Sequence, residues 1–403
     1  MPPFRAGDVN SPEIEHMQNE IIREFHQLYK GRPLVVRAPG RINLIGEHTD
    51  YNDGFVLPAA IDRAVYFAIA VSGDDRCDIT AKNMARSVRF FVSDSEPPIE
   101  DVWVKYLFGV VSILRERTGR VGGFRLVFRG DIPLGAGLSS SAALTCGFAT
   151  ALNELFALGL SRREIARIGQ QTEHEYAGVR TGIMDQFASS FGEAHHAMLL
   201  DCRSLQYDLI PATFGEYTLL LFDSMVKHAL VESSYNDRRA SCERGVAIIA
   251  RQYPEVKALR DVNRELLSEF ADEMGYDTYV KCNFVVEENL RTRVAAEAMR
   301  AGDVEMLGSL LYDSHRGLSE AYRVTCRETD FLVEQTRAMD HVLGARQMGG
   351  GFGGCTLNLV HQDQLEATAL ALEDAYHEQL GLAGRFYVVE VTDGIQSFEP
   401  EAW

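Results

Sequence analysis

Apolar residues in this chain recur at helical spacing in some segments and alternate with polar residues in others. Between residues 11 and 30 the apolar positions 14, 17, 21, 22, 25 and 28 form one stripe, which predicts an amphipathic helix. Residues 124–128 alternate and predict a strand. Further helices are expected at 102–117, 139–157 and 161–176, and the region 230–340 is expected to be mostly helical. Further strands are expected at 34–38, 55–58, 64–71, 198–200, 218–222, 355–360 and 386–391.

Strands and helices are mixed along the whole chain, which predicts an α+β fold in preference to a simple doubly wound sheet. A length of 403 residues is sufficient for two or three domains. We expect two, residues 1–200 and residues 201–403, because a new set of strands follows the helical first half between about 195 and 215.

Composition and charge narrow the class of protein. Hydrophobic residues make up 46% of the chain, so a sizeable core is expected. The net charge of −18 argues against a nucleic-acid partner, which requires a basic surface. Seven cysteines without a CxxC pair indicate neither a zinc site nor a disulfide framework. Without an apolar signal segment or a run of roughly 18 apolar residues, a cytoplasmic protein without a membrane partner is expected.

The densest polar segment lies between two strand-like apolar runs. Its ten residues from 41 to 50 include Arg41, Glu47, His48 and Asp50. Polar side chains crowded into a buried turn need a polar partner. A small polyhydroxylated ligand would suit them, because carboxylates accept from hydroxyls while arginine and imidazole can donate. A metal site at His48 and Asp50 is the alternative, but no second His/Asp cluster at helical spacing accompanies it.

A glycine-rich turn follows the strand predicted at 124–128 and leads into a helix. Gly135 and Gly137 would let the backbone approach a ligand closely. Three serines stand at the helix start, where free N–H groups and the helix dipole attract anions. The turn lacks the lysine of a Walker A loop. Composition alone leaves a phosphate cradle and an ordinary capped helix equally open.

Three other features of the sequence are candidates for chemistry. Asp185 stands between Met184 and Phe187, so it is expected to be paired or functional, with a helix cap as the alternative. Glu173 lies at the edge of an inward helix face and needs a partner, for which a salt bridge or a backbone hydrogen bond is the plain alternative. The five glycines of residues 349–354 indicate a backbone passing close to something, or else a bulge or tight hairpin.

Three of these segments resemble, in chain order, the three motifs of the GHMP kinase family. They are residues 38–52, 130–142 and 348–357, and the first is of the galactokinase subtype. The resemblance covers about residues 17 to 395. It implies a two-lobed fold with a mixed sheet and helices in each lobe, an active site in the cleft between lobes, and a C-terminal tail that packs back on the first lobe. It also implies ATP-dependent phosphorylation of the anomeric hydroxyl of D-galactose with Mg²⁺.

The resemblance also assigns roles to residues. It implies that Asp185 is the base that accepts the sugar's proton and that Arg41 lies beside it and stabilises phosphate charge. The sugar contacts it implies are Glu47, His48, Asp50, Gly182 and Tyr235. The ATP contacts it implies are Gly135, Gly137, Leu138, Ser139, Ser140 and Ser141, and the metal ligands are Ser141 and Glu173. We assign the discrimination between galactose and glucose to Asp50, because a buried carboxylate rejects a ligand that leaves it unpaired.

Two alternatives remain beside this reading. One is a kinase for a related sugar, such as N-acetylgalactosamine or arabinose. The other is a non-catalytic sensor that binds galactose and ATP to control a partner. The intact serine turn at 139–141, together with Arg41 and Asp185, argues against the sensor.

Overall fold

The largest sheet of the protein has six strands in the order β13-β1-β3-β6-β4-β5. The computed structural model describes residues 12–227 and 231–398. The strands are β1 (Leu34–Asn43), β3 (Pro58–Val71), β4 (Arg76–Ala81), β5 (Arg86–Phe91), β6 (Phe124–Gly130) and β13 (Gln396–Phe398). Neighbours are antiparallel except β4 and β6, which are parallel, so the sheet is mixed.

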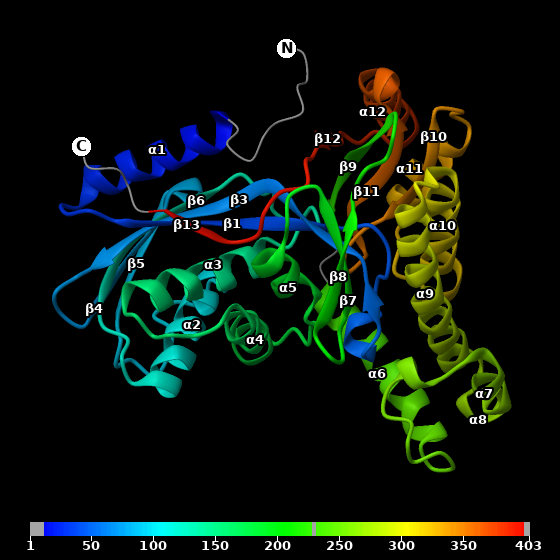
Figure 1. Cartoon of the computed structure of the whole chain (residues 1–403), viewed down its shortest axis with the longest axis horizontal. Helices are drawn as coiled ribbons and strands as arrows, with labels where there is room; N and C mark the ends of the chain where they lie inside the picture. Colours follow the sequence, from blue (N-terminus) through cyan, green and yellow to red (C-terminus); the bar gives the residue numbers. More distant parts are fainter. Residues whose placement is uncertain (1–11, 228–230, 399–403) are drawn as a thin grey trace.

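Helices cover both faces of this sheet (Figure 1). On one face lies α1 (Pro12–Leu28), whose Ile21 and Phe25 are fully buried in a cluster with Tyr66 and Val127. On the other face lie α2 (Val102–Thr118), α3 (Ser140–Leu155), α4 (Arg162–Thr172) and α5 (Met184–Phe191). Burial of these apolar helix faces against the sheet forms the main core of the N-terminal half.

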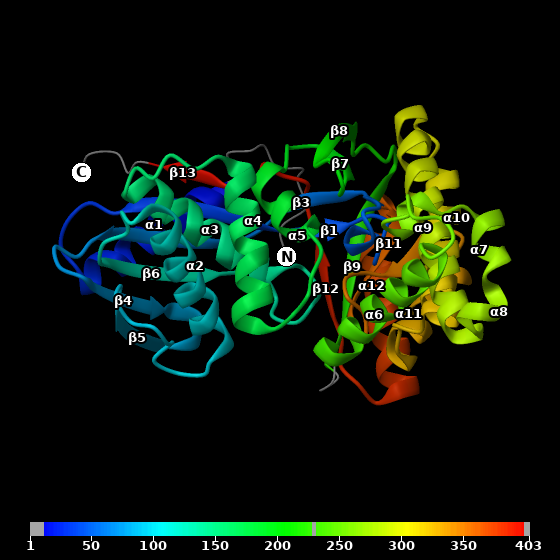
Figure 2. The same cartoon turned by 90° about the horizontal axis from the view of Figure 1, so that it is seen from below.

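The C-terminal half is built on a four-stranded sheet in the order β10-β11-β9-β12. Its strands are β9 (Tyr217–Lys227), β10 (Val342–Gln347), β11 (Gly353–His361) and β12 (Arg385–Val388). Its helices are α6 (Val231–Ile249), α7 (Arg264–Glu269), α8 (Ala271–Met274), α9 (Tyr276–Ala301), α10 (Val304–Arg316), α11 (Arg327–Arg337) and α12 (Leu365–Leu380). A small sheet of β2 (Phe55–Val56), β7 (His196–Asp201) and β8 (Gln206–Pro211) lies between the two halves. Figure 2 shows α7–α10 at the end of the molecule opposite β4 and β5.

The α+β prediction is confirmed, and most predicted elements are present with shifted ends. The strand predicted at 34–38 continues to Asn43, because the polar residues that follow are buried in the sheet as well. The helix predicted at 161–176 ends at Thr172 and is followed by a π-helical turn, Glu173–Ala177. The first residue of the helix predicted at 11–30 lies outside the described residues.

The strands β4 and β5 were not predicted from the sequence. Most residues of β5, an edge strand, are exposed, so it carries little apolar alternation. The start of α4 does follow the sequence expectation, because Ser161 and Glu164 form a capping box.

The C-terminal segment returns to the N-terminal half. β13 pairs antiparallel with β1, placing Phe398 opposite Val35. Arg37 of β1 is fully buried and donates to the carbonyls of Ile61, Asp62 and Asp393. The tail therefore completes the large sheet, while the domain division near residue 200 stays a prediction. Within the described ranges 12–227 and 231–398, no helix combines the length and apolarity that a membrane span requires.

Candidate active site

The three glycine-rich segments singled out in the sequence pack against one another. The N–H of Arg41 donates to the carbonyl of Leu138 at 3.1 Å. A Cβ at Gly40 would lie 2.7 Å from that same carbonyl, so only glycine fits there. A Cβ at Gly349 would lie 3.2 Å from the carbonyl of Gly137. Each segment thus limits the position of the next, and the candidate site forms where they meet.

Arg41 and Asp185 form a two-pronged ion pair at this junction, as the sequence predicted. Arg41 Nε donates to Asp185 Oδ1 at 2.7 Å and Nη2 donates to Oδ2 at 2.9 Å. The remaining Nη1 donates to the carbonyl of Gly137 at 2.5 Å. The Ser139 hydroxyl donates to Asp185 Oδ2 at 2.5 Å. The guanidinium is buried, and these contacts fix the orientation of the carboxylate between β1 and the glycine-rich turn.

The glycine-rich turn ends at the start of α3. Gly135 and Gly137 have φ of 80° and 76°, the left-handed region that glycine favours. Ser139 is the residue before the helix, and its side chain caps no backbone N–H, because it points to Asp185 instead. The N–H groups of Ser140 and the next residues therefore have no side-chain cap, which is the arrangement that attracts phosphate.

The predicted sugar contacts come from three different elements. His48 and Asp50 follow β1, Gly182 precedes α5, and Tyr235 lies on α6. The rings of His48 and Tyr235 are 5.5 Å apart. Any Cβ at Gly182 would overlap the carboxylate of Asp50. The structure therefore brings all four together, beside the carboxylate of Asp185.

The enclosed position of these side chains changes their protonation. Burial, and after it the charge of Asp185, raises the pKa of Asp50 to about 7. Burial, with smaller contributions from Arg238 and Arg346, lowers the pKa of His48 to about 3, so its ring is neutral. His48 Nδ1 shares a hydrogen bond of 2.9 Å with the Tyr51 hydroxyl, whereas the buried Nε2 has no partner. An unpaired buried nitrogen is suited to a polar ligand.

Glu173 also has an unsatisfied oxygen. Its Oε2 accepts from the Thr181 hydroxyl at 2.7 Å, but its buried Oε1 has no hydrogen-bond partner. Burial raises the pKa of Glu173 to about 7, and the hydroxyls of Thr181 and Ser141 oppose that rise. A free carboxylate oxygen facing a serine hydroxyl fits a hard cation. The residues described include no cluster of three or more His, Cys, Asp or Glu side chains that could hold a metal, so Glu173 and Ser141 would supply only part of the shell of such an ion.

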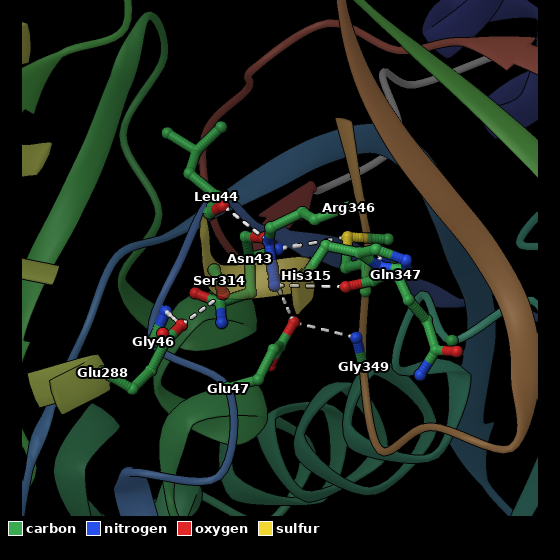
Figure 3. A network of polar contacts seen from close by, with 12 residues as sticks. Asn43, Leu44, Gly46, Glu47, Glu288, Ser314, His315, Arg346, Gln347 and Gly349 are labelled. Carbon is green, nitrogen blue, oxygen red and sulfur yellow. Dashed lines mark hydrogen bonds and ion pairs between the residues drawn. The ribbon is translucent and has the colours of Figure 1, made fainter. Parts of the chain in front are cut away.

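Glu47 is held by Gly349 of the glycine-rich segment and by Arg346, which was not predicted from the sequence (Figure 3). Its Oε1 accepts from the N–H of Gly349 at 2.8 Å and from the guanidinium of Arg346, a fully buried residue of β10. Arg346 also donates to the carbonyls of Asn43 at 3.0 Å and Leu44 at 2.9 Å. A lone arginine within a strand-like run is the signal that could have identified it.

A second buried carboxylate supports the same segment from α9. Glu288 is fully buried, and its Oε1 accepts from the N–H of Gly46 at 3.1 Å and from the Ser314 hydroxyl at 2.6 Å (Figure 3). Its Oε2 accepts from Arg291 at 2.8 Å. Glu288 was not predicted from the sequence either, because its partner Gly46 is 242 residues away along the chain.

Comparison with known proteins first defines the class. The GHMP kinases N terminal domain model matches residues 105–193, and the GHMP kinases C terminal model matches residues 295–378. A mevalonate kinase crystal structure has the same fold, with a TM-score of 0.61 at 17% identity over 89% of this chain and 99% of that chain. Fold and motifs together define a GHMP kinase.

Within this class, the chain belongs to the galactokinase family. The galactokinase galactose-binding signature matches residues 23–71. The chain is 38% identical to a galactokinase of Thermotoga petrophila over 90% of this chain and 99% of the relative. It is 38% identical to one of Enterococcus faecalis over 89% of this chain and 93% of the relative. A crystal structure of Lactococcus lactis galactokinase with galactose has a TM-score of 0.89 at 33% identity, over 95% of this chain and 100% of that chain.

Proposed function

We propose that this protein transfers the terminal phosphoryl group of ATP to the anomeric hydroxyl of D-galactose, releasing galactose 1-phosphate and ADP. The observation that carries the proposal is the ion pair of Arg41 and Asp185, held beside the uncapped start of α3. Membership of the galactokinase family supports the choice of sugar.

Asp185 is the residue we assign to the proton of the attacking hydroxyl. As the new bond between the sugar oxygen and the γ-phosphorus forms and the bond to ADP breaks, the hydroxyl proton passes to this carboxylate. Arg41 holds Asp185 through two parallel hydrogen bonds, which set the direction of the carboxylate. The guanidinium also supplies positive charge where the transferred group carries negative charge.

The start of α3 is the site we assign to the phosphates of ATP. The carbonyl of Gly137 accepts a hydrogen bond from Arg41. The N–H groups that follow Ser139 point out of the first helical turn. The residues assigned to ATP are Gly135, Gly137, Leu138, Ser139, Ser140 and Ser141. Ser141 and Glu173 would hold Mg²⁺, which neutralises phosphate charge when bound. The unpartnered Oε1 of Glu173 supports that assignment.

The sugar is assigned to the polar side chains that lie beside the ion pair of Arg41 and Asp185. Glu47 and Asp50 are the acceptors for its hydroxyls, and His48 Nε2 is the third polar contact. Gly182 leaves the room that the Asp50 carboxylate needs, and Tyr235 closes the site from α6. Among the described residues no cation contacts Asp50 directly, so its carboxylate needs a hydroxyl of the sugar as a donor. Glucose, the C4 epimer, would not supply that hydroxyl in the right direction, and the buried carboxylate would be left without it, which disfavours glucose.

A coupled assay of ADP release with galactose, N-acetylgalactosamine, arabinose and glucose tests the proposal. We expect turnover with galactose and little with glucose. Faster turnover with N-acetylgalactosamine or arabinose would identify a kinase for a related sugar. No ADP with any sugar, while calorimetry still detects galactose binding, would contradict the proposed reaction and favour a sensor.

A further inference from the structure

Among the described residues, Arg37 and Arg346 are the arginines with no exposed surface, and they have different surroundings. Arg37 donates to the backbone carbonyls of Ile61, Asp62 and Asp393, and its guanidinium forms no hydrogen bond or ion pair with a carboxylate of the described residues. Arg346 donates to backbone carbonyls and, in addition, to the carboxylate of Glu47. We propose that Arg346 is a positioning residue of the sugar site, which aims one oxygen of Glu47 at a sugar hydroxyl. This inference rests on the proposed sugar contact of Glu47.

The two oxygens of Glu47 are not equivalent. Oε1 already accepts hydrogen bonds from Arg346 and from the N–H of Gly349, so it is not free to accept one from a ligand. The hydrogen bonds of this carboxylate with described residues both end on Oε1, so Oε2 remains available to a ligand hydroxyl. With one oxygen held by two donors, the carboxylate cannot rotate freely, and the direction of the other oxygen is fixed.

Arg346 is itself fixed by several acceptors. Its Nε donates to the carbonyl of Leu44 at 2.9 Å, Nη2 donates to that of Asn43 at 3.0 Å, and Nη1 donates to that of Gln347 at 3.2 Å. Figure 3 shows the guanidinium between β10 and the segment that carries Glu47. One planar group thus sets both the path of the backbone before Glu47 and the direction of its side chain.

The energetics of burial favour a positioning role over simple stabilisation. Removing two charges from water is costly, and a buried ion pair is often no more stabilising than apolar residues of the same size. Arg346 and Glu47 are 0% and 2% exposed, so they bear that cost nearly in full. An ion pair in such a place is expected to contribute orientation, and the positive charge of Arg346 also helps to keep His48 neutral.

The test compares five variants: R346M, R346K, E47Q, the double variant R346M/E47Q, and R37M as the matched control. For each, galactose KM, ATP KM and kcat are measured together with the melting temperature, and galactose binding is measured by calorimetry. We expect R346M to raise galactose KM by roughly tenfold or more while ATP KM changes by less than about twofold. R346K keeps the charge but not the planar fork, so its galactose KM should lie between those of wild type and R346M.

The double variant tests whether Arg346 acts through Glu47. If it does, R346M/E47Q should have a galactose KM no higher than the worse single variant, and it should melt above R346M because no buried carboxylate is left unpaired. R37M should melt below wild type with an unchanged galactose KM. If R346M does not fold, the galactose KM of R346K is compared with that of the wild type instead.

Two results would refute the positioning role of Arg346 while the sugar contact of Glu47 stands, and a third would remove both. A galactose KM in R346M and R346K equal to that of wild type, while E47Q raises it, would refute the role of Arg346 alone. Equal increases in R346M and R37M would assign both arginines to general stability. An unchanged galactose KM in E47Q would instead remove the sugar contact of Glu47, and the inference with it.

Discussion

The negative charges of the carboxylates in the candidate site are balanced by neighbouring arginines to different degrees. Asp185 is paired with Arg41 and Glu47 with Arg346, both by direct hydrogen bonds. Asp50 accepts only the N–H of Tyr51 among the described groups, and burial raises its pKa to about 7. A ligand that brings hydroxyl donors to Asp50 would therefore relieve the cost of its charge, which links ligand binding to pH.

The ionisation of Asp50 should make galactose binding depend on pH. If galactose requires the carboxylate form, galactose KM should be flat above pH 7 and rise below it by about tenfold per pH unit. The variant D50N should bind galactose weakly and lose this pH dependence. D62N is the control, because burial also raises the pKa of Asp62, to about 6, away from the site. A galactose KM that stays constant from pH 8 to pH 5.5 in the wild type would contradict the role of Asp50.

The same shift predicts the effect of Asp50 on stability. The ordinary pKa of an aspartate is 3.8, whereas that of Asp50 in the folded protein is about 7, so the unfolded chain loses this proton first as the pH rises. The contribution of Asp50 to folding is therefore fully present below about pH 4 and is lost as pH rises toward 7. D50N should raise the melting temperature at pH 8 and leave it nearly unchanged at pH 4. A lower melting temperature for D50N at pH 8 would contradict this.

At the scale of elements, the start of α5 positions two functional groups at once. Asp185 lies in the first turn of this helix, and Gly182 precedes it in van der Waals contact with Asp50. G182A should fold, because the residue is not in the left-handed region, but its Cβ would displace Asp50. We expect galactose KM to rise by about tenfold or more with little change in ATP KM. G122A is the control, and equal galactose KM values for the two variants would refute the contact.

Local sequence patterns predicted the elements that carry a strong signal of their own. Arg41 and Asp185, 144 residues apart, were expected to meet because each lies in a recognisable motif. Arg346 and Glu288 were not expected, since nothing near them in the chain indicates their partners, which are 299 and 242 residues away. The turn after Thr172 was also missed, because a π-helical turn has no spacing of its own in the sequence.

At the scale of the whole molecule, contacts between residues far apart in the sequence join the two halves. The last described strand, β13, pairs with β1, whose opposite end carries Arg41 and leads to Glu47. From the other half, Arg346 and Glu288 bind the segment that follows β1. The candidate site therefore depends on contacts between the N-terminal segment after β1 and residues of the C-terminal half.

A chain that ends at Gly394 tests the contribution of the tail. Loss of β13 would leave the edge of β1 unpaired and uncover the cluster to which Phe398 contributes. We expect the melting temperature to fall by several degrees or more. Galactose KM of the folded fraction should stay near that of the full chain, because Arg37 keeps its contact with Asp393. An unchanged melting temperature would show that the pairing contributes little.

Arg41 and Asp185 are proposed to act together on one sugar hydroxyl, and the variant D185N tests this role most directly. The amide keeps the size of the side chain but neither accepts the proton nor pairs with the guanidinium as a carboxylate does. The measurement is ADP release with saturating galactose and ATP, with galactose binding followed by calorimetry on the same sample. We expect retained galactose binding and a turnover reduced by about a hundredfold or more. Turnover equal to that of the wild type would contradict it.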